Sequence, residues 1–80
     1  MRTRIVVHLE GGLVQSVSSN SPIDAEVVVI DYDTEGAEQE EIHRVPQSDD
    51  PSDVSDACIG WHGDVGTTDN NIVAYLDKIA

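Results

Sequence analysis

The sequence contains few cysteines, aromatic residues and basic residues. Among its 80 residues are one Cys, one Trp, two Tyr, no Phe and only four Lys and Arg. A lone cysteine cannot form an internal disulfide, which excludes a small disulfide-stabilised scaffold. Four basic residues are too few for the positive patch of a DNA- or RNA-binding module. No apolar run approaches the roughly 18 residues of a membrane-spanning helix, so no contact with a membrane is expected.

Acidic residues are abundant and unevenly distributed. Sixteen Asp and Glu give a formal net charge of −12. Residues 31–56 hold ten acids and one Arg, a net charge of −9, while the other 54 residues carry −3. A solvated acidic face that serves solubility is one interpretation. The other is a surface that resembles nucleic acid, because a duplex carries about one phosphate charge per 1.7 Å.

The length and the apolar residues indicate fold class and domain number. Eighty residues predict a single small acidic domain over residues 1–80. The apolar set has 11 Val and 7 Ile but only 3 Leu, which favours strands over a helical bundle. The start of the chain is not typical of a signal peptide, because its apolar run ends at His8. We therefore expect the protein in the cytoplasm of a bacterial host cell.

Alternating and continuous apolar residues predict three strands in the first part of the chain. Residues 4–9 and 13–19 alternate, and the Gly pair between them supplies the positive φ of a tight hairpin turn. Asn20, Ser21 and Pro22 form the next break. Residues 26–32 are apolar on both faces, which predicts a central strand covered on both sides, or covered by a partner.

The second part of the chain is less regular. We expect a turn at 33–36, a short acidic helix at 37–44 with a Glu40–Arg44 pair, and a polar loop at 46–53. The alternation of residues 56–62 predicts a fourth strand, followed by a loop at 63–69. From Ile72 the apolar spacing predicts a helix capped by Thr68 or Asp69. The expected fold is α+β: a mainly antiparallel sheet of three or four strands, a short acidic helix or loop, and a C-terminal helix on one face.

The stretch DYDTEG (31–36) resembles the start of a calcium-binding loop. It places oxygens at positions 1, 3 and 5 and glycine at position 6. Position 12, which needs a bidentate Glu, is Ile42, and a strand rather than a helix precedes the stretch. We interpret it as an acidic turn, with weak calcium binding as the alternative.

The sequence gives little indication of a metal site, a phosphate-binding site or a catalytic site. Cys58 and His62 would lie about 13 Å apart along a strand, and zinc sites use three or four such ligands. No phosphate-binding loop, dinucleotide fingerprint or nucleophile elbow occurs. We therefore expect no cofactor, no metal and no enzymatic activity. Trp61 either packs in the core against the third strand or anchors an interface, where Trp is enriched.

Two stretches resemble known small proteins. The sequences IVVHLEGGLVQSV (5–17) and VVIDYDTEG (28–36) resemble small uncharacterised proteins of bacteria and their mobile elements. In size and acidity the chain is also similar to phage- and plasmid-borne inhibitors, such as anti-CRISPR and anti-restriction proteins. The resemblance implies a protein-binding inhibitor and transfers no catalytic residue.

Two function hypotheses follow. The first is a non-enzymatic, anti-CRISPR-like inhibitor that binds a basic nucleic-acid-binding surface of a host protein or nucleoprotein complex and contacts no nucleic acid itself. The second is a small structural or accessory protein that forms a homodimer through its sheet. The predicted partner-binding residues are Asp31, Asp33, Glu35, Glu38, Glu40, Glu41, Asp49, Asp50, Asp53, Asp56 and Trp61.

Overall fold

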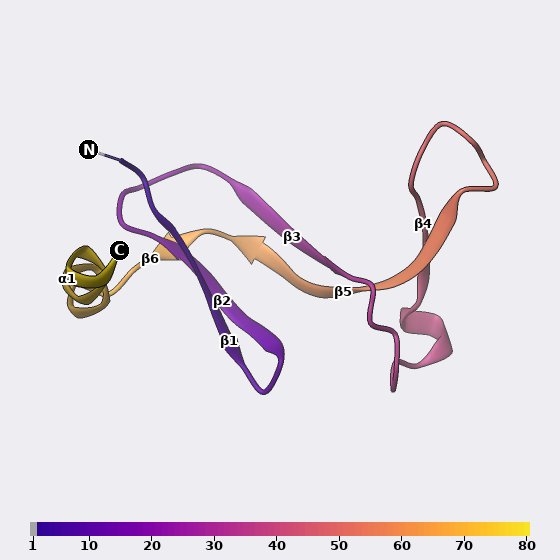
Figure 1. The fold of residues 1–80 in the computed structure, drawn as a ribbon, viewed down its shortest axis with the longest axis horizontal. Helices are drawn as coiled ribbons and strands as arrows, with labels where there is room; N and C mark the ends of the chain where they lie inside the picture. Colours follow the sequence, from indigo (N-terminus) through magenta and orange to yellow (C-terminus); the bar gives the residue numbers. More distant parts are fainter. Residues whose placement is uncertain (1) are drawn as a thin grey trace. The chain divides into compact units, whose positions relative to one another are not determined.

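The computed structural model describes residues 2–80. Within these residues it has two three-stranded sheets and one C-terminal α-helix, drawn in Figure 1. This confirms the α+β class and the C-terminal helix, although the strands belong to two sheets rather than one. The chain divides into a terminal unit (residues 2–27 and Trp61–Ala80) and an internal unit (Val28–Gly60). The single domain expected from the length stays a prediction.

The elements follow the chain in a simple order. They are β1 (Ile5–Glu10), β2 (Leu13–Ser19), β3 (Glu26–Asp31), the 3₁₀ turn η1 (Gln39–Glu41), β4 (His43–Pro46), β5 (Val54–Asp64), β6 (Gly66–Thr67) and α1 (Asn70–Ile79). The strand order is β1-β2-β6 in one sheet and β3-β5-β4 in the other. The ranges of β3 and β5 each extend through both units.

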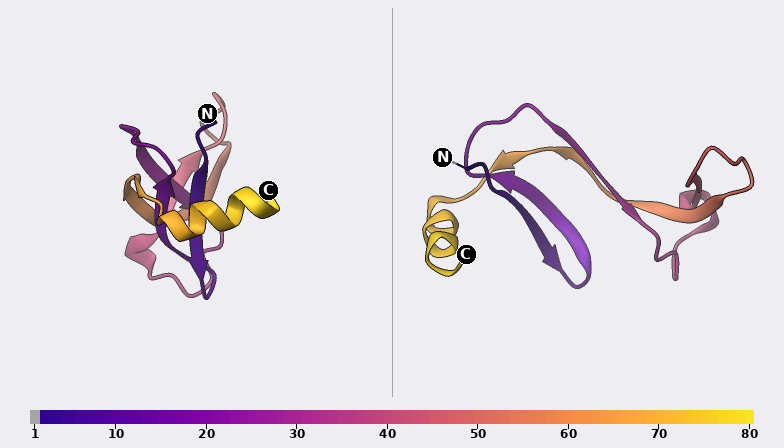
Figure 2. Two further views of the ribbon diagram at one scale, coloured as in Figure 1. Left: turned by 90° about the vertical axis from the view of Figure 1, so that its left-hand side faces the viewer. Right: turned by 45° about the horizontal axis from the view of Figure 1, so that its top comes forward.

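The terminal unit is organised around the β1–β2 hairpin. Gly11 and Gly12 both adopt positive φ, 61° and 78°, which suits the tight connection between antiparallel strands. The ladder pairs Ile5 with Ser19, and its register shifts between His8 and Leu9. Figure 2 shows the two strands side by side along the hairpin. The two predicted strands and their turn are confirmed.

The core of the terminal unit is formed where β2 meets β6. Val17 is 2% exposed, and the hydroxyl-bearing Ser18, Ser19 and Thr68 are also buried. β6 pairs with β2 in parallel, and the Thr68 N–H donates to the Ser19 carbonyl at 2.9 Å. Residues 63–69 were expected to form a loop, which is wrong: β5 continues to Asp64, and Gly66 and Thr67 form β6. The parallel pairing with β2 is a contact that local sequence does not specify.

Helix α1 begins at a well-formed cap. The Asp69 carboxylate accepts the N–H of Asn71 at 2.8 Å, so Asp69 rather than Thr68 is the capping residue. Such a bond satisfies one of the N–H groups that have no partner in the first helical turn. Val73 and Leu76 are half-buried, whereas Ile72, Tyr75 and Ile79 are exposed. No helix of residues 2–80 is both long and apolar enough to span a membrane.

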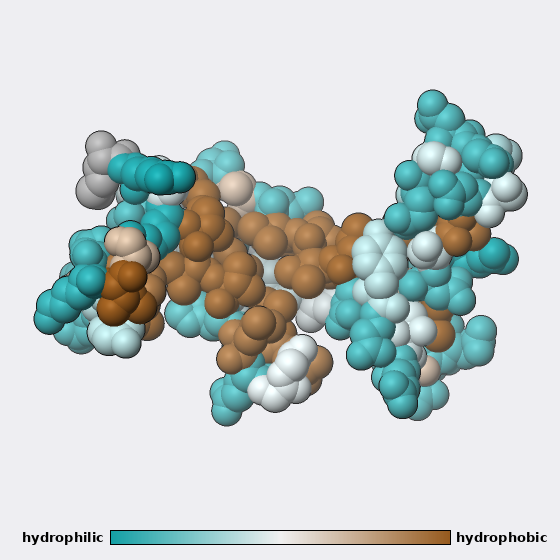
Figure 3. Space-filling view, in the orientation of Figure 1, coloured by the Kyte–Doolittle hydropathy of each residue, from teal (hydrophilic) through white to brown (hydrophobic). Residues whose placement is uncertain are grey.

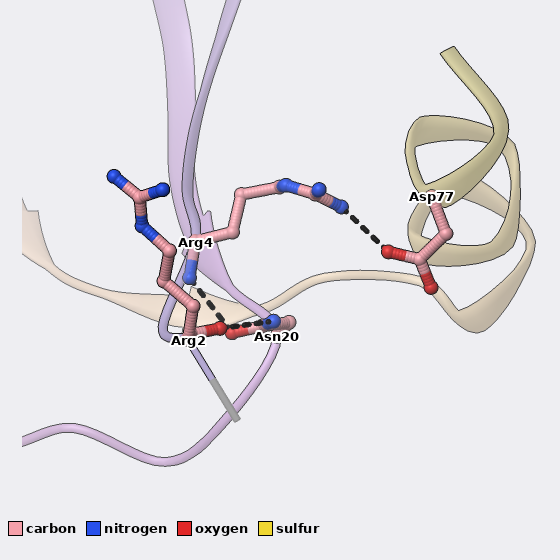
Figure 4. Close-up of polar contacts among 4 residues, drawn as sticks. All are labelled: Arg2, Arg4, Asn20 and Asp77. Carbon is pink, nitrogen blue, oxygen red and sulfur yellow. Dashed lines mark hydrogen bonds and ion pairs between the residues drawn. The ribbon is translucent and has the colours of Figure 1, made fainter. Parts of the chain in front are cut away.

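Asn20 and Arg4 join the parts of the terminal unit, as Figure 4 shows. The Arg4 N–H donates to Asn20 Oδ1 at 3.0 Å, and Asn20 Nδ2 donates to the Arg2 carbonyl at 3.3 Å. The Arg4 guanidinium reaches Asp77 of α1, with Nη1 and Oδ1 2.9 Å apart. The predicted break after β2 is therefore a hydrogen-bonded connection rather than a loose loop.

The internal unit has a small sheet with little core. β5 lies between β3 and β4, and Ala57 of β5, 1% exposed, is the only buried hydrophobic residue within Val28–Gly60. The expected third strand is present, but a central position is wrong, and the alternative that a partner covers it stays a prediction. β3 is an edge strand, and its Val28 and Ile30 are exposed. Four consecutive apolar residues predict burial on both faces, yet strand order depends on which distant segments pair.

For residues 37–44, where a short acidic helix or a loop was expected, the helix is wrong. Only Gln39–Glu41 form a 3₁₀ turn, Ile42 is extended, and the chain continues as β4. Residue 45 precedes a proline, which disfavours helical backbone there. Arg44 lies opposite Asp56 in the β4–β5 ladder and therefore does not form the expected pair with Glu40. The polar loop between β4 and β5 is confirmed.

Candidate functional site

The ten acids of residues 31–56 all lie in the internal unit. This unit carries a net charge of −9 and the terminal unit −3. Asp31 is half-buried, and the other nine acids are exposed. The acidic segment of the sequence therefore coincides with one structural unit. We call these ten residues the acidic set, and their role in binding stays a prediction.

Asp31 and Asp33 organise the turn that follows β3. Asp31 Oδ1 accepts the N–H of Asp33 at 2.9 Å, and Asp33 Oδ1 accepts the N–H of Glu35 at 3.1 Å. The turn closes where the Ala37 N–H donates to the Thr34 carbonyl at 3.0 Å, and Gly36 takes a positive φ of 81°. Aspartates that bond the backbone two residues ahead are typical of Asx turns. The calcium-like spacing is thus used, in this structure, to hold an acidic turn.

The loop between β4 and β5 is held in the same way. Asp50 Oδ1 accepts both the N–H and the hydroxyl of Ser52, at 2.9 and 2.8 Å. These bonds, the backbone one first, lower the pKa of Asp50 below its ordinary value. The Gln47 N–H donates to the Asp53 carbonyl at 2.8 Å. Asp49 and Asp53 keep exposed carboxylates beside this closed loop.

Few cations balance the acidic set. Arg44 is the only basic residue of the internal unit apart from His43. Its Nε lies 4.0 Å from Asp56 Oδ1, and both side chains are largely exposed. An exposed pair at this distance contributes little. The carboxylates of the unit therefore face solvent with almost no local neutralisation.

Cys58 is half-buried in the internal unit. Its Sγ lies 3.7 Å from the Asp31 carbonyl oxygen and 3.6 Å from that of Asp33, as a weak donor. His62 instead lies beside Glu26, with Nε2 and Oε2 3.2 Å apart. Among residues 2–80, no three His, Cys, Asp or Glu side chains gather in a way that would hold a metal.

Trp61 belongs to the terminal unit, so the structure does not group it with the acidic set. It is half-buried, and its ring covers Gly63 two residues along β5. A Cβ at Gly63 would come within 3.0 Å of the indole. The glycine therefore makes room for the ring, and an anchoring role for Trp61 stays a prediction.

The sequence analysis did not predict a group of hydrogen-bonded polar side chains in the terminal unit. Thr68 Oγ1 donates to Ser18 Oγ at 2.7 Å, and His8 Nε2 lies 3.1 Å from the same oxygen. A Ser–His contact is also the first element of a nucleophilic site. However, within residues 2–80 no hydrogen bond orients the other ring nitrogen of His8. Because Ser18 is buried, we interpret these contacts as a structural connection between β2 and the residues that follow β6. The serines of β2 alone gave no signal of their distant partner.

A second feature not predicted is an open hollow of about 300 Å³ in the terminal unit. It is lined by Arg2, Arg4, Asn20, Val73 and Asp77. The Arg4 guanidinium is already engaged by Asp77. The hollow is therefore largely the space around an existing ion pair.

Comparison with family models, with curated proteins and with solved structures found no match. The function is therefore inferred from the geometry and charge of this chain alone.

Proposed function

We propose that the protein is a non-enzymatic inhibitor that binds a basic surface of another protein through its internal unit. The observation that carries the proposal is a net charge of −9 within the 33 residues of Val28–Gly60. The basic surface would be one that otherwise holds nucleic acid, as in an anti-CRISPR-like mimic. Such an inhibitor would act in the cytoplasm of a bacterial host cell.

The arrangement of the carboxylates supports this proposal. Nine of the ten lie on two hydrogen-bonded turns and on the short segment around η1, and Asp56 lies on β5, so their spacing is partly preorganised before any partner binds. Preorganised charges lose less conformational entropy on binding. Complementary charge also accelerates association, and salt weakens this effect because the Debye length is about 8 Å at physiological ionic strength.

The test is competition with nucleic acid. The chain is used to capture proteins from a bacterial lysate, and each captured protein is tested for binding to labelled duplex DNA and RNA. We expect a captured protein whose nucleic-acid binding is displaced by this chain at low salt, and whose complex with this chain weakens as the salt concentration rises. Captured proteins that bind nucleic acid equally well in the presence of the chain would contradict the proposal.

A second function is favoured by a different observation. Ile5, Val7 and Leu9 alternate along β1, which is an edge strand, and all three are exposed, as is Leu13 of β2. An uncovered apolar strand edge is an association site. On this alternative the protein is a small accessory homodimer joined through β1. Sedimentation equilibrium distinguishes the inhibitor from the accessory homodimer. A stable dimer that becomes monomeric in Val7→Lys supports the accessory role.

A further inference from the structure

Strand β3 presents an open edge in the internal unit. β5 is its only neighbour among the described strands, so alternate N–H and C=O groups on the other side have no strand partner. Natural edge strands are usually protected by lysine, proline, a bulge or a covering segment. Residues 27–30 are Val-Val-Val-Ile and contain none of these residue types. The edge therefore has the composition of a strand that accepts another strand.

One face of this part of the sheet is apolar and uncovered. Val28 and Ile30 are 47% and 43% exposed, whereas Val29 and Asp31, on the opposite face, lie against Gly60 of β5. Because side chains alternate along a strand, Ile59 points away from the Gly60 side, and it is 48% exposed. Val28, Ile30 and Ile59 thus share one face. Figure 3 shows hydrophobic residues gathered along β3 and β5.

The charge around this edge indicates which occupant fits. Asp31, Asp33 and Glu35 lie at its C-terminal end, and the unit carries −9 in total. A second copy of the chain would bring an equal negative charge beside the first, which repels it. A strand with lysine or arginine at its ends would instead place opposite charges together. Cross-strand pairs of opposite charge stabilise a sheet, and like charges destabilise it.

We propose that β3 is the docking edge for an extended segment of the partner, with alternating apolar residues flanked by Lys or Arg. The charge requirement rests on the proposed function, and the strand addition goes beyond it. In such complexes the main-chain hydrogen bonds supply affinity and the alternate side chains supply specificity. Val28, Ile30 and Ile59 would contact the apolar residues of the segment, and the acidic turn after β3 would contact its basic end.

The experiment uses three synthetic peptides with the same core of alternating valine and threonine. The first has lysines at both ends, the second has the same sequence with N-methylated core amides, and the third has glutamates in place of the lysines. Affinity is measured by fluorescence anisotropy, and contact with β3 by hydrogen exchange. We expect the lysine peptide to bind and to protect those amides of residues 28–31 that point away from β5, and N-methylation to lower its affinity about tenfold or more.

The other outcomes separate this inference from the proposed function. Equal, salt-sensitive binding of the methylated and unmethylated lysine peptides overturns the strand addition and leaves the electrostatic proposal standing. Equal binding of the glutamate peptide, with protection of β3, overturns the charge-based function and leaves only the strand edge. Absence of binding by all three peptides overturns the inference, as does a dimer of the chain alone in which the β3 amides that point away from β5 are already protected.

A protein variant tests the apolar face separately. Val28→Thr with Ile30→Thr keeps β-branched residues in the strand but removes apolar contact area. We expect this double variant to bind the lysine peptide several-fold more weakly, with unchanged amide exchange of β3 in the free protein. The matched control is Ile5→Thr with Val7→Thr on β1, the edge of the other sheet, which should leave peptide binding unchanged. Equal losses in the two variants would contradict docking at β3.

Discussion

The two units are stabilised by different means. The terminal unit carries −3, buries Val17 with a hydrogen-bonded group of hydroxyl side chains, and has a capped helix and an ion pair between Arg4 and Asp77. The internal unit carries −9 and buries only Ala57 among its hydrophobic residues. Its connections are held by aspartates that bond nearby backbone. Charge is thus concentrated in the unit where burial contributes least.

The largest expected effect concerns the packing of each unit. Val17→Ala in β2 removes two buried methyl groups and should lower the free energy of unfolding by about 2 kcal/mol. Val45→Ala in β4, where the side chain is half-buried, should cost less than about 1 kcal/mol. Urea denaturation followed by circular dichroism measures both. Equal losses of unfolding free energy in the two variants would contradict the difference in packing between the units.

The second prediction sharpens the difference in charge. Neutralising three acids near η1 should lower the affinity for the lysine-flanked peptide about tenfold at low salt. Both the electrostatic attraction that speeds association and the contacts in the complex depend on charge. The unfolding free energy should stay the same or rise, since like-charge repulsion falls. The matched control neutralises three exposed acids of the terminal unit. The test set is Glu38, Glu40 and Glu41 changed to Gln, and the control set is Glu10→Gln, Asp24→Asn and Asp64→Asn.

Equal weakening by both sets would show that only total charge matters. No weakening by either would leave the acidity as a device for solubility. The control deliberately avoids Asp69 and Asp77, because the structure shows the first capping α1 and the second bonded to Arg4.

The third prediction concerns the helix of the terminal unit. Asp69→Ala removes the acceptor of the Asn71 N–H and should lower the unfolding free energy by about 1 kcal/mol. Asp69→Asn keeps an acceptor oxygen and should lower the unfolding free energy by only about a few tenths of a kcal/mol. Thermal unfolding of the two variants gives the comparison. A full loss in Asp69→Asn would mean that charge at the helix start, rather than the hydrogen bond, is responsible.

The smallest expected effect is a pH dependence in the internal unit. The bonds from Ser52 favour the ionised form of Asp50 and lower its pKa. The stabilisation they provide is therefore complete above the ordinary carboxyl pKa and is lost as the pH falls through the lowered value. The NMR shift of the Ser52 amide should follow this titration, and in Asp50→Asn it should be independent of pH. A titration at or above the ordinary pKa would contradict the arrangement of this loop.

Local patterns predicted several elements closely. The Gly pair between two alternating segments specified the β1–β2 hairpin, because paired glycines accept the positive φ of a tight turn. The apolar spacing from Ile72 predicted α1, and it left the cap open between Thr68 and Asp69. For the segment after Gly36 the sequence left a short helix or a loop open, and the helix does not form, in line with the extended bias of the residue before Pro46. The hydrogen-bonded side chains of His8, Ser18 and Thr68 gave no local signal, since they lie up to 60 residues apart in the sequence.

The distribution of charge and the positions of most strands follow from the amino-acid sequence alone. Net charge depends only on composition, and alternation or continuous apolar runs depend on neighbouring residues. The tertiary structure alone decided that β3 lies at an edge, that His43–Pro46 pairs with β5, and that Gly66–Thr67 joins β2 in parallel. These outcomes depend on pairing between distant segments, whose order in a sheet is set by competition among all strands. The open β3 edge therefore follows from the fold, whereas the acidity beside it follows from the sequence.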